Sequence, residues 1–402
     1  MNRGRGILTG IIHDFYFTKV ELNNKKMRNN LLFCIFFVCH ALYCSAQTID
    51  SKKNLIRVGN LAPIYWNDEQ ESENVHGRNV SKHTSFLPGT VWKDTKGHPI
   101  NAHGGGVIYS KGSYYWYGEH KIEGRSEAEG ADGGVHCYSS TDLYNWQDEG
   151  MVLAVDDQPK KSDIEPGCIL ERPKVVYNQQ TQTYVMYFKF YPKGTGYDTG
   201  YVGVATASCP TGPFTYQHKF LGAGSPKGSG DFCMYQDEDG TVYHFTVRKP
   251  DKAFCGGRLK SDYLYPENDY RVLSEIPLHT EAPAMVRTLG KYYMLGSGSS
   301  GWAPNSARAF SSPSITGEYS NLANPCVGIN PNNQLGPEKT FGGQISFILP
   351  VEGMKNAYIA LFDIWNPGRA SDGLYVWLPL QFKEGNPVIE WQDRWDLSFF
   401  KE

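Results

Sequence analysis

Five polar positions, set by a repeated pattern, are the strongest candidates for chemistry in this chain. About ten residues after each of them, a turn leads into a short apolar run rich in tyrosine, as in residues 111–117. The five positions hold Asn101 or His103, Glu171, Asp231, Glu281 and Gln344. Three of these residues are carboxylates, which can donate and accept protons, and one is an amide, which is a poor proton acceptor. We expect the five positions to be equivalent and to converge in the folded protein.

Carboxylates that meet in a concave, aromatic-lined site are suited to glycoside hydrolysis. The leaving oxygen needs an acid and the attacking water needs a base, and repulsion between carboxylates keeps one of them protonated near neutral pH. We predict that Glu281 is the acid, because Pro283 restricts the backbone just after it. Asp231, which is short and follows a glycine, suits a role in tuning that acid. Glu171 is a sugar-hydroxyl acceptor, a second acid or a base.

The repeat also predicts the elements that must position these side chains. A period of roughly 50–70 residues with one hairpin signal per unit is typical of a β-propeller, and the chain shows no sustained helical periodicity. We therefore predict an all-β fold, a five-bladed β-propeller over residues 91–402, whose innermost strands begin near one end of a central channel. We expect the last strands, residues 374–380 and 388–391, to close the ring by pairing with the first blade.

Two further segments precede the predicted propeller. Residues 1–46 read as an upstream extension plus a signal peptide, in which Met27 begins a positively charged stretch, residues 31–43 are apolar and a small-residue cleavage site follows. We expect translation to begin at Met27 and the protein to be exported to the periplasm, the cell surface or the medium. The apolar run is too short to span a bilayer, and lipidation of Cys44 is the competing interpretation. Residues 47–90 are polar and irregular and are predicted to form a lead-in segment.

Composition restricts the partners of the folded part. The formal net charge is -3 and the basic residues are scattered, so the chain lacks the basic stripe with which proteins neutralise nucleic-acid phosphates. Aromatic residues make up 14% of the chain, which leaves flat rings available for stacking.

None of the six cysteines after the signal peptide forms a Cys-x-x-Cys pair, which argues against structural zinc. One or two disulfides and buried free thiols fit the spacing equally well.

The ordered motifs of this chain resemble glycoside hydrolase family 43, and most closely its exo-β-1,3-galactanase branch. The resemblance covers roughly residues 90–400 and rests on Asn101-Ala-His-Gly-Gly-Gly, Tyr115-Trp-Tyr-Gly-Glu119, Glu171-Arg-Pro-Lys-Val, Ser229-Gly-Asp231, Glu281-Ala-Pro-Ala and Ser299-Ser-Gly-Trp-Ala-Pro-Asn305. It implies a five-bladed propeller that hydrolyses its substrate with inversion of the anomeric centre. It also implies that Glu281 is the acid, that Asp231 tunes its pKa, and that galactose is released from the β-1,3-galactan backbone of arabinogalactan.

Blade one departs from the wider family at the residue that would take the proton from water. The resemblance places an aspartate base there, whereas this chain has Asn101 and His103. In the galactanase branch a glutamine of the last blade is thought to hold the water, and Gln344 occupies that place, preceded by Gly343 where the branch usually has serine. Proton removal is then left to a tautomeric amide or to Glu171.

Further residues are candidates for gripping the sugar around this core. They are Glu119, His103, Tyr197, Ser300 and Trp302, although strand-end packing would explain each of them equally well. This chemistry requires no cofactor. By resemblance, His103 lies where related enzymes in some cases hold a structural calcium ion through water, but we do not predict a bound metal. We expect a monomer that acts on a polysaccharide or oligosaccharide, with no nucleic-acid partner and no membrane span.

Two other functions fit the same fold. An exo-acting arabinofuranosidase or xylosidase would rely, by family resemblance, on the first-blade aspartate that this chain lacks. A non-catalytic carbohydrate-binding propeller would explain the missing base, but sugar binding needs no proton donor and the chain has Glu281 together with Asp231. We therefore expect an inverting glycoside hydrolase that releases galactose from the non-reducing end of β-1,3-galactan.

Overall fold

A computed structural model describes residues 49–50, 55–56, 64–65, 82–155 and 163–401 of the chain. The chain separates into two compact units, Met1–Gly77 and Arg78–Glu402. In the first unit, a small antiparallel sheet contains β1 (Ile49–Asp50), β2 (Leu55–Ile56) and β3 (Ile64–Tyr65). The predicted extension and signal peptide, with Met27 and Cys44, lie outside the described residues. In the described part, no helix is long and apolar enough to cross a membrane.

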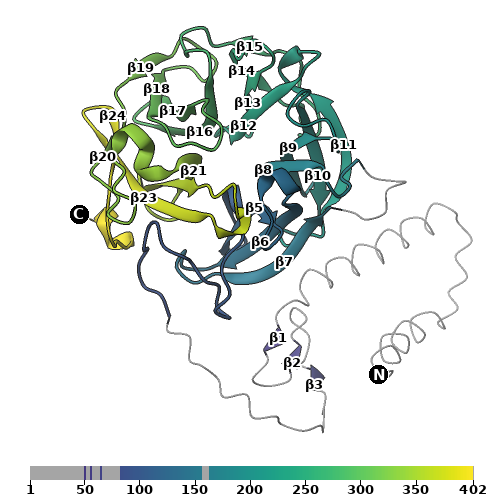
Figure 1. The fold of residues 1–402 in the computed structure, drawn as a ribbon, viewed down its shortest axis with the longest axis vertical. Helices are drawn as coiled ribbons and strands as arrows, with labels where there is room; N and C mark the ends of the chain where they lie inside the picture. Colours follow the sequence, from purple (N-terminus) through teal and green to yellow (C-terminus); the bar gives the residue numbers. More distant parts are fainter. Residues whose placement is uncertain (1–48, 51–54, 57–63, 66–81, 156–162, 402) are drawn as a thin grey trace, which may run out of the picture. The chain divides into compact units, whose positions relative to one another are not determined.

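The second unit is the predicted five-bladed β-propeller, and each blade is an antiparallel sheet (Figure 1). Blade one contains β4 (His103–Ser110), β5 (Ser113–Lys121), β6 (Asp132–Ser140) and β7 (Gln147–Ala154). Blade two contains β8 (Ile169–Asn178), β9 (Thr183–Tyr191), β10 (Tyr201–Ala207) and β11 (Thr215–Leu221). Blade three contains β12 (Ser229–Gln236), β13 (Val242–Arg248), β14 (Phe254–Arg258) and β15 (Arg271–Val272).

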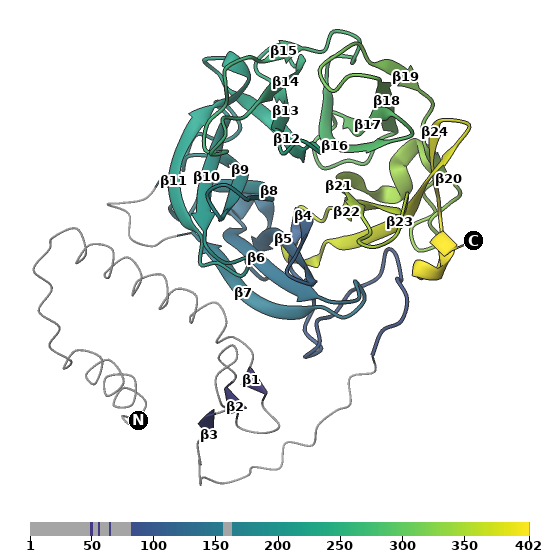
Figure 2. The ribbon, with the colours of Figure 1, turned by 180° about the vertical axis from the view of Figure 1, so that it is seen from behind.

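Blades four and five complete the ring, as the reverse view also shows (Figure 2). Blade four contains β16 (Thr280–Thr288), β17 (Lys291–Gly298), β18 (Ala307–Ser312) and β19 (Ser320–Leu322). Blade five contains β21 (Gln344–Pro350), β22 (Tyr358–Ile364), β23 (Leu374–Lys383) and β24 (Asn386–Glu390), with β20 (Cys326–Val327) as a parallel edge strand. Short 3₁₀ helices connect some of the strands, namely η1 (Glu127–Glu129), η2 (Gly222–Gly224), η3 (Pro337–Gly342) and η4 (Ala370–Asp372), and a further one, η5 (Leu397–Lys401), follows the last strand.

The tyrosine-rich apolar runs, which follow the predicted site residues by about ten positions, form the second strand of each blade. The turns before them place a residue in the left-handed region, for example Gly112 at φ 87° and Gly240 at φ 83°, which glycine adopts at little cost. Neighbouring blades pack face to face, so these strands are buried on both sides, and β9 is buried from Tyr184 to its end. This burial explains why these runs are apolar throughout instead of alternating with polar residues.

Every innermost strand carries a β-bulge close to its predicted site residue. The register shifts lie between His103 and Gly106, Glu171 and Lys174, Ser229 and Phe232, Glu281 and Ala284, and Ile345 and Phe347. Within three of these bulges, Gly104, Arg172 and Ala282 have φ values of 58°, 53° and 52°. A bulge bends the strand and re-aims a side chain. The repeated bulges therefore turn the beginnings of the five inner strands toward a common site.

The ring closes differently from our prediction. The final strand β24 pairs with β23 and β20, within blade five, and not with blade one. The segment before blade one closes the ring instead, because Phe86 pairs with Trp395 and Thr90 with Tyr375. The Phe86 and Trp395 rings also stack, with 4.4 Å between their centroids. Side-chain packing between blades and these short bridges thus replace the strand pairing that we expected.

The cysteines in the described blades show which of them are buried free thiols, one of the two alternatives that their spacing left open. Cys137, Cys168, Cys233, Cys255 and Cys326 are free and buried. These five behave as small apolar core residues. Burial raises the pKa of the Cys233 thiol to about 12, and nearby Lys174 counteracts part of this rise, so the thiol stays protonated and unreactive near neutral pH.

Candidate active site

A hollow of about 240 Å³ brings together side chains from all five blades. Seven of the predicted site residues line it, namely Glu119, Glu171, Tyr197, Asp231, Glu281, Trp302 and Gln344. Six further lining residues with charged or aromatic side chains were not predicted, namely Arg172, Lys189, Tyr191, Lys249, Lys252 and Trp365. The hollow is therefore rich in charge of both signs and has aromatic rings on its wall, which is the composition of a site for a polar, ring-shaped ligand.

Glu281 lies at the beginning of β16 and has the properties of a proton donor. Ser299 Oγ donates to its Oε2 at 2.6 Å, and Gln344 Nε2 donates to its Oε1 at 3.2 Å. Burial raises the pKa of Glu281, and the negative charge of Asp231 raises it further. The Ser299 hydroxyl can also accept a hydrogen bond, so it can support both the protonated and the ionised acid.

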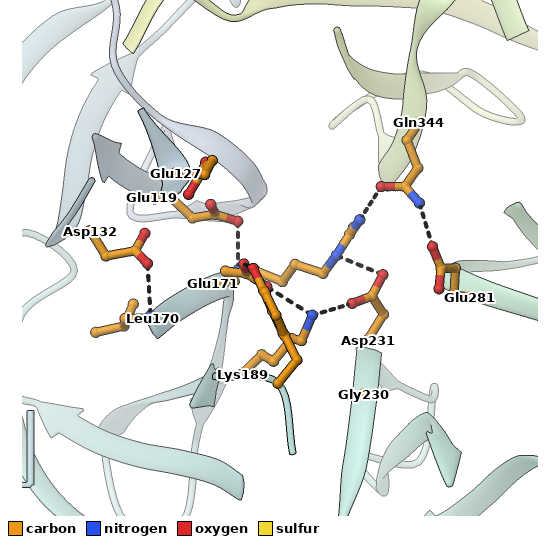
Figure 3. Close-up of polar contacts among 12 residues, drawn as sticks. Glu119, Glu127, Asp132, Leu170, Glu171, Lys189, Gly230, Asp231, Glu281 and Gln344 are labelled. Atoms are coloured by element: carbon orange, nitrogen blue, oxygen red, sulfur yellow. Dashed lines mark hydrogen bonds and ion pairs between the residues drawn. The ribbon is translucent and has the colours of Figure 1, made fainter. Parts of the chain in front are cut away.

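Asp231 lies in the bulge of β12 and is held as an anion. Arg172 Nε is 3.0 Å from its Oδ2, and Lys189 Nζ is 2.8 Å from its Oδ1 (Figure 3). Burial alone would raise the pKa of Asp231, but Arg172 and Lys189 together lower it below its ordinary value. Asp231 and Glu281 therefore have pKa values shifted in opposite directions, as expected of two carboxyl groups with different roles.

The amide of Gln344 is oriented by four hydrogen bonds. Its Oε1 accepts from Arg172 Nη2 at 2.5 Å and from Trp365 Nε1 at 3.0 Å. Its Nε2 donates to Ser297 Oγ at 2.9 Å and to Glu281. These partners determine which end of the amide is oxygen, because Arg172 and Trp365 can only donate. Both lone pairs of the carbonyl oxygen are occupied in this arrangement, so a water molecule must replace one donor to bind there.

Glu171, at the bulge of β8, is engaged by two neighbours. Lys189 Nζ is 2.8 Å from its Oε2, and Tyr197 Oη donates to its Oε1 at 2.5 Å. Burial would raise the pKa of Glu171, but Lys189 and then Lys121 lower it. Glu171 is thus an ionised hydrogen-bond acceptor, and its low pKa makes it a weak base for removing a proton from water.

Aromatic rings form part of the wall of the hollow. The Trp302 and Trp365 rings meet edge to face, with 5.4 Å between centroids. Lys249 Nζ lies 4.4 Å from the centroid of the Tyr191 ring, and it donates to the carbonyl oxygen of Tyr197 at 2.6 Å. Such rings can stack on the apolar face of a sugar while the carboxylates accept from its hydroxyl groups.

Three residues named from the sequence are not among those that line the hollow. Asn101 instead clamps the backbone of Lys121, with Asn101 Nδ2 donating to Lys121 O at 2.7 Å and Lys121 N donating to Asn101 Oδ1 at 2.9 Å. His103 is buried against Tyr375, with 5.2 Å between ring centroids. Ser300 Oγ donates to the carbonyl oxygen of Ala303. In this structure the blade-one contribution to the hollow is therefore Glu119, from the second strand.

The described residues contain no group of three or more His, Cys, Asp or Glu side chains that could hold a metal ion. His103 Nδ1 lies 3.9 Å from Asp363 Oδ1. Burial, and then the charge of Lys121, lower the pKa of His103 to about 3, so its ring is neutral near neutral pH. A neutral imidazole is able to accept a hydrogen bond from water, but this pair alone does not form a cation site.

The residues that sequence reasoning missed include direct partners of the predicted residues, namely Arg172, Lys189 and Trp365. Lys189 lies opposite Glu171, near the end of the second strand of blade two, and Arg172 follows Glu171 directly. Trp365 follows β22 in blade five. The position of Lys189 opposite Glu171 was the one usable signal, since antiparallel pairing places the two side chains on the same face.

Comparison with known proteins identifies the family to which this chain is similar. The model of glycosyl hydrolases family 43 matches residues 102–340. A β-1,3-galactosidase of family 43, solved with galactodeoxynojirimycin, is 36% identical with a TM-score of 0.70, over 78% of this chain and 100% of that chain. No curated protein matches the chain.

Two exo-β-1,3-galactanases of known structure are also similar. The Phanerochaete chrysosporium protein, solved with β-1,3-galactotriose, is 31% identical with a TM-score of 0.68, over 78% of this chain and 68% of that chain. The Clostridium thermocellum protein is 31% identical with a TM-score of 0.66, over 77% of this chain and 66% of that chain. The family model covers more than half of this chain, and the hollow contains a glutamate with a raised pKa beside an ionised aspartate. The chain therefore belongs to glycosyl hydrolase family 43 and is a glycoside hydrolase.

Proposed function

We propose that this enzyme releases galactose from the non-reducing end of β-1,3-galactan with inversion of the anomeric centre. The observation that carries the proposal is the contact between Gln344 and Glu281, which places an amide beside the candidate acid. Asn101 and His103, where the resemblance implies an aspartate base, are not among the residues that line the hollow. The galactosidase and galactanases that resemble this chain over more than three quarters of its length support the choice of substrate.

In the proposed reaction, Glu281 protonates the glycosidic oxygen as the bond to the anomeric carbon breaks. Burial and Asp231 keep this carboxyl protonated at a higher pH than an ordinary glutamate, so it can donate. Asp231 does not donate, because Arg172 and Lys189 keep it ionised. Its negative charge also favours the positive charge that develops on the sugar ring in an oxocarbenium-like transition state.

Water attacks the opposite face of the sugar, and we propose that Gln344 orients it. The bound substrate would displace the Trp365 N–H from Gln344 Oε1, which frees a lone pair for a proton of the water. Arg172 would retain its bond to the same oxygen and keep the amide in place. The proton of the water then passes either to Glu171 or to Oε1 of this amide. In the second case the amide becomes its imidic acid tautomer as Nε2 gives a proton to Glu281, which has just donated its own.

Replacement of the acid tests the proposal. We expect Glu281→Gln to abolish galactose release from β-1,3-galactan while the circular dichroism spectrum and melting temperature remain those of the parent. Proton NMR of the parent reaction should show galactose born as the α-anomer. Parental turnover in the variant would refute the assignment of the acid, and release of arabinose or xylose from aryl glycosides in place of galactose would refute the substrate.

Export of the enzyme is a separate proposal, supported by the charged and apolar segments before residue 47. Expression of the whole gene, followed by N-terminal sequencing of the mature protein, would show cleavage after Ala46 if the proposal is right. A protein retained in the cytoplasm with residues 27–46 intact would contradict it.

A further inference from the structure

A buried lysine lies behind the active-site hollow and has no direct part in the proposed reaction. The side chain of Lys121, at the end of β5, is 1% exposed, and its Nζ contacts three carboxylates. The distances are 2.9 Å to Glu119 Oε2, 3.0 Å to Glu127 Oε1 and 2.6 Å to Asp132 Oδ1. Lys121 Nζ donates hydrogen bonds to Glu127 and Asp132, and it forms an ion pair with Glu119. A buried cluster of this kind gains little stability on average, which suggests that another purpose maintains it.

Two of these carboxylates hold the backbone of the neighbouring blade on both sides of Glu171. Glu119 Oε1 accepts from the backbone N–H of Arg172 at 2.8 Å, and Asp132 Oδ2 accepts from the backbone N–H of Leu170 at 3.3 Å (Figure 3). This stretch is the bulge of β8, in which Arg172 has a φ of 53°. The left-handed conformation is unfavourable for a residue with a side chain, so it needs support from its surroundings.

The side chain of Arg172 connects this bulge to the groups that take part in the proposed reaction. Arg172 Nε contacts Asp231, and Arg172 Nη2 donates to Gln344. In the proposed mechanism, both Asp231 and Gln344 act next to Glu281. A displacement of the β8 backbone would therefore move the partner of the tuning aspartate and the partner of the water-orienting amide together. Misplacement of such groups by about 1 Å can slow a reaction on the order of 100-fold.

We propose that Lys121 is a positioning residue. It gathers Glu119, Glu127 and Asp132, and through Glu119 and Asp132 it holds the backbone of residues 170–172 in place. The Arg172 guanidinium is thereby kept against Asp231 and Gln344. The inference rests on the proposed function, because it uses the roles assigned there. It goes beyond that function by giving a task to a residue of blade one that lies outside the hollow.

The electrostatics of the cluster give the proposal a pH signature. Burial lowers the pKa of Lys121, but the three carboxylates outweigh this effect. The pKa therefore lies well above its ordinary value because of Asp132, Glu119 and Glu127. Burial raises the pKa of Asp132 to about 7, and Lys121 limits this rise. Other charged or titratable groups in the described residues also face this cluster, namely His103 on β4, Cys168 just before β8, Glu171, Arg172 and Lys174 on β8, Tyr197, Asp363 on β22 and Tyr375 on β23. Removal of the ammonium would make the carboxylates take up protons at a higher pH.

The test compares the pH profile of kcat/KM in two variants with opposite expected effects. Lys121→Met should lower kcat/KM on the order of 10- to 100-fold and move the acidic limb of the profile to higher pH. Glu127→Gln removes one negative charge and leaves Lys121 in place, so it should move the acidic limb to lower pH. The matched control is Lys82→Met, because Lys82 is 76% exposed and pairs only loosely with Asp142, at 3.6 Å. We expect parental values for this control.

A second readout does not depend on the substrate. A crystal structure of Lys121→Met should show the Arg172 guanidinium displaced from Gln344, while the rest of the propeller is unchanged. Should Lys121→Met fail to fold, the shift in Glu127→Gln decides the question. Parental acidic limbs in the variants that fold, or an undisturbed Arg172–Gln344 contact, would overturn the inference. Failure of the proposed function would look different: the parent would leave β-1,3-galactan intact, and the profiles would then be measured on the aryl glycoside that it cleaves.

Discussion

The charge of Asp231 sets the proton affinity of Glu281, and its removal has a predictable direction. Burial and Asp231 both raise the pKa of Glu281, so the acid is protonated up to a higher pH than usual. In Asp231→Asn the burial remains, but the anion is lost, and Arg172 and Lys189 lose one of their negative partners. All these changes lower the pKa of Glu281. In the proposed reaction activity requires the protonated acid, so activity should then be lost at a lower pH than in the parent.

The basic limb of kcat/KM measures this shift directly, since it reports the free enzyme. The matched control is Asp163→Asn, which also removes a lysine-paired aspartate, but one that is 42% exposed and pairs with Lys219 on the outer strand of blade two. We expect its basic limb to coincide with that of the parent. A basic limb that stays in place in Asp231→Asn would mean that another group donates the proton.

The amide of Gln344 should affect turnover more than binding. We expect Gln344→Ala to lower kcat on the order of 100-fold or more, as for loss of a group that assists proton transfer, with a much smaller change in KM. Gln217→Ala serves as the control, because the exposed Gln217 amide donates to Thr206 and Thr215 on the outside of blade two. Steady-state kinetics on β-1,3-galactan give both constants. A raised KM at parental kcat would make Gln344 a substrate-binding residue only.

At the scale of the strand, the bulges decide which side chains reach the hollow, and Gly104 provides the sharpest test. A Cβ on Gly104 would lie 2.3 Å from Glu119 Oε1 and 3.0 Å from the Trp365 ring. Gly104→Ala must therefore move Glu119, which would release the backbone of Arg172. We expect a loss of activity of at least about tenfold and a decrease of about 1–3 kcal/mol in the free energy of unfolding.

Gly112→Ala separates the clash from the backbone strain. Gly112 also has a positive φ, 87°, but a Cβ there would meet nothing within 4 Å. This variant should lose about 1 kcal/mol of unfolding free energy and keep its activity per folded molecule. Denaturant unfolding and kinetics on both proteins make the comparison. Equal activity losses in the two variants would show that strain alone, and not the position of Glu119, explains the effect of Gly104→Ala.

The repeat in the sequence predicted the five blades and the strands that carry the site. This was possible because the same turn and tyrosine-rich run recur, each with a polar residue about ten positions before it. It could not predict the partners of those residues. Arg172 reaches Gln344 across 172 positions of the chain, and the contact exists only because blades two and five both face the channel. The failure at blade one has the same cause, since Asn101 and His103 have the expected position in sequence but contact Lys121 and Tyr375 instead.

At the scale of the whole molecule, the closure of the ring depends on aromatic packing between residues that lie about 300 positions apart. Trp395 is 5% exposed, its ring stacks on Phe86, and its Nε1 donates to the carbonyl oxygen of Trp377 at 2.8 Å. This local packing replaces the long strand pairing that would lock the last blade to the first, so its loss should loosen the entire propeller.

We therefore expect Trp395→Ala to lower the free energy of unfolding by about 3–5 kcal/mol, the usual cost of truncating a buried tryptophan. Chemical denaturation followed by circular dichroism would measure the change. Tyr109→Ala is the control, because the Tyr109 side chain is 44% exposed, and we expect it to cost less than about 1 kcal/mol. A loss of similar size in both variants would contradict a special role for this closure. The larger loss in Trp395→Ala should also lower the temperature at which activity disappears, because the hollow takes residues from all five blades and exists only while the ring is closed.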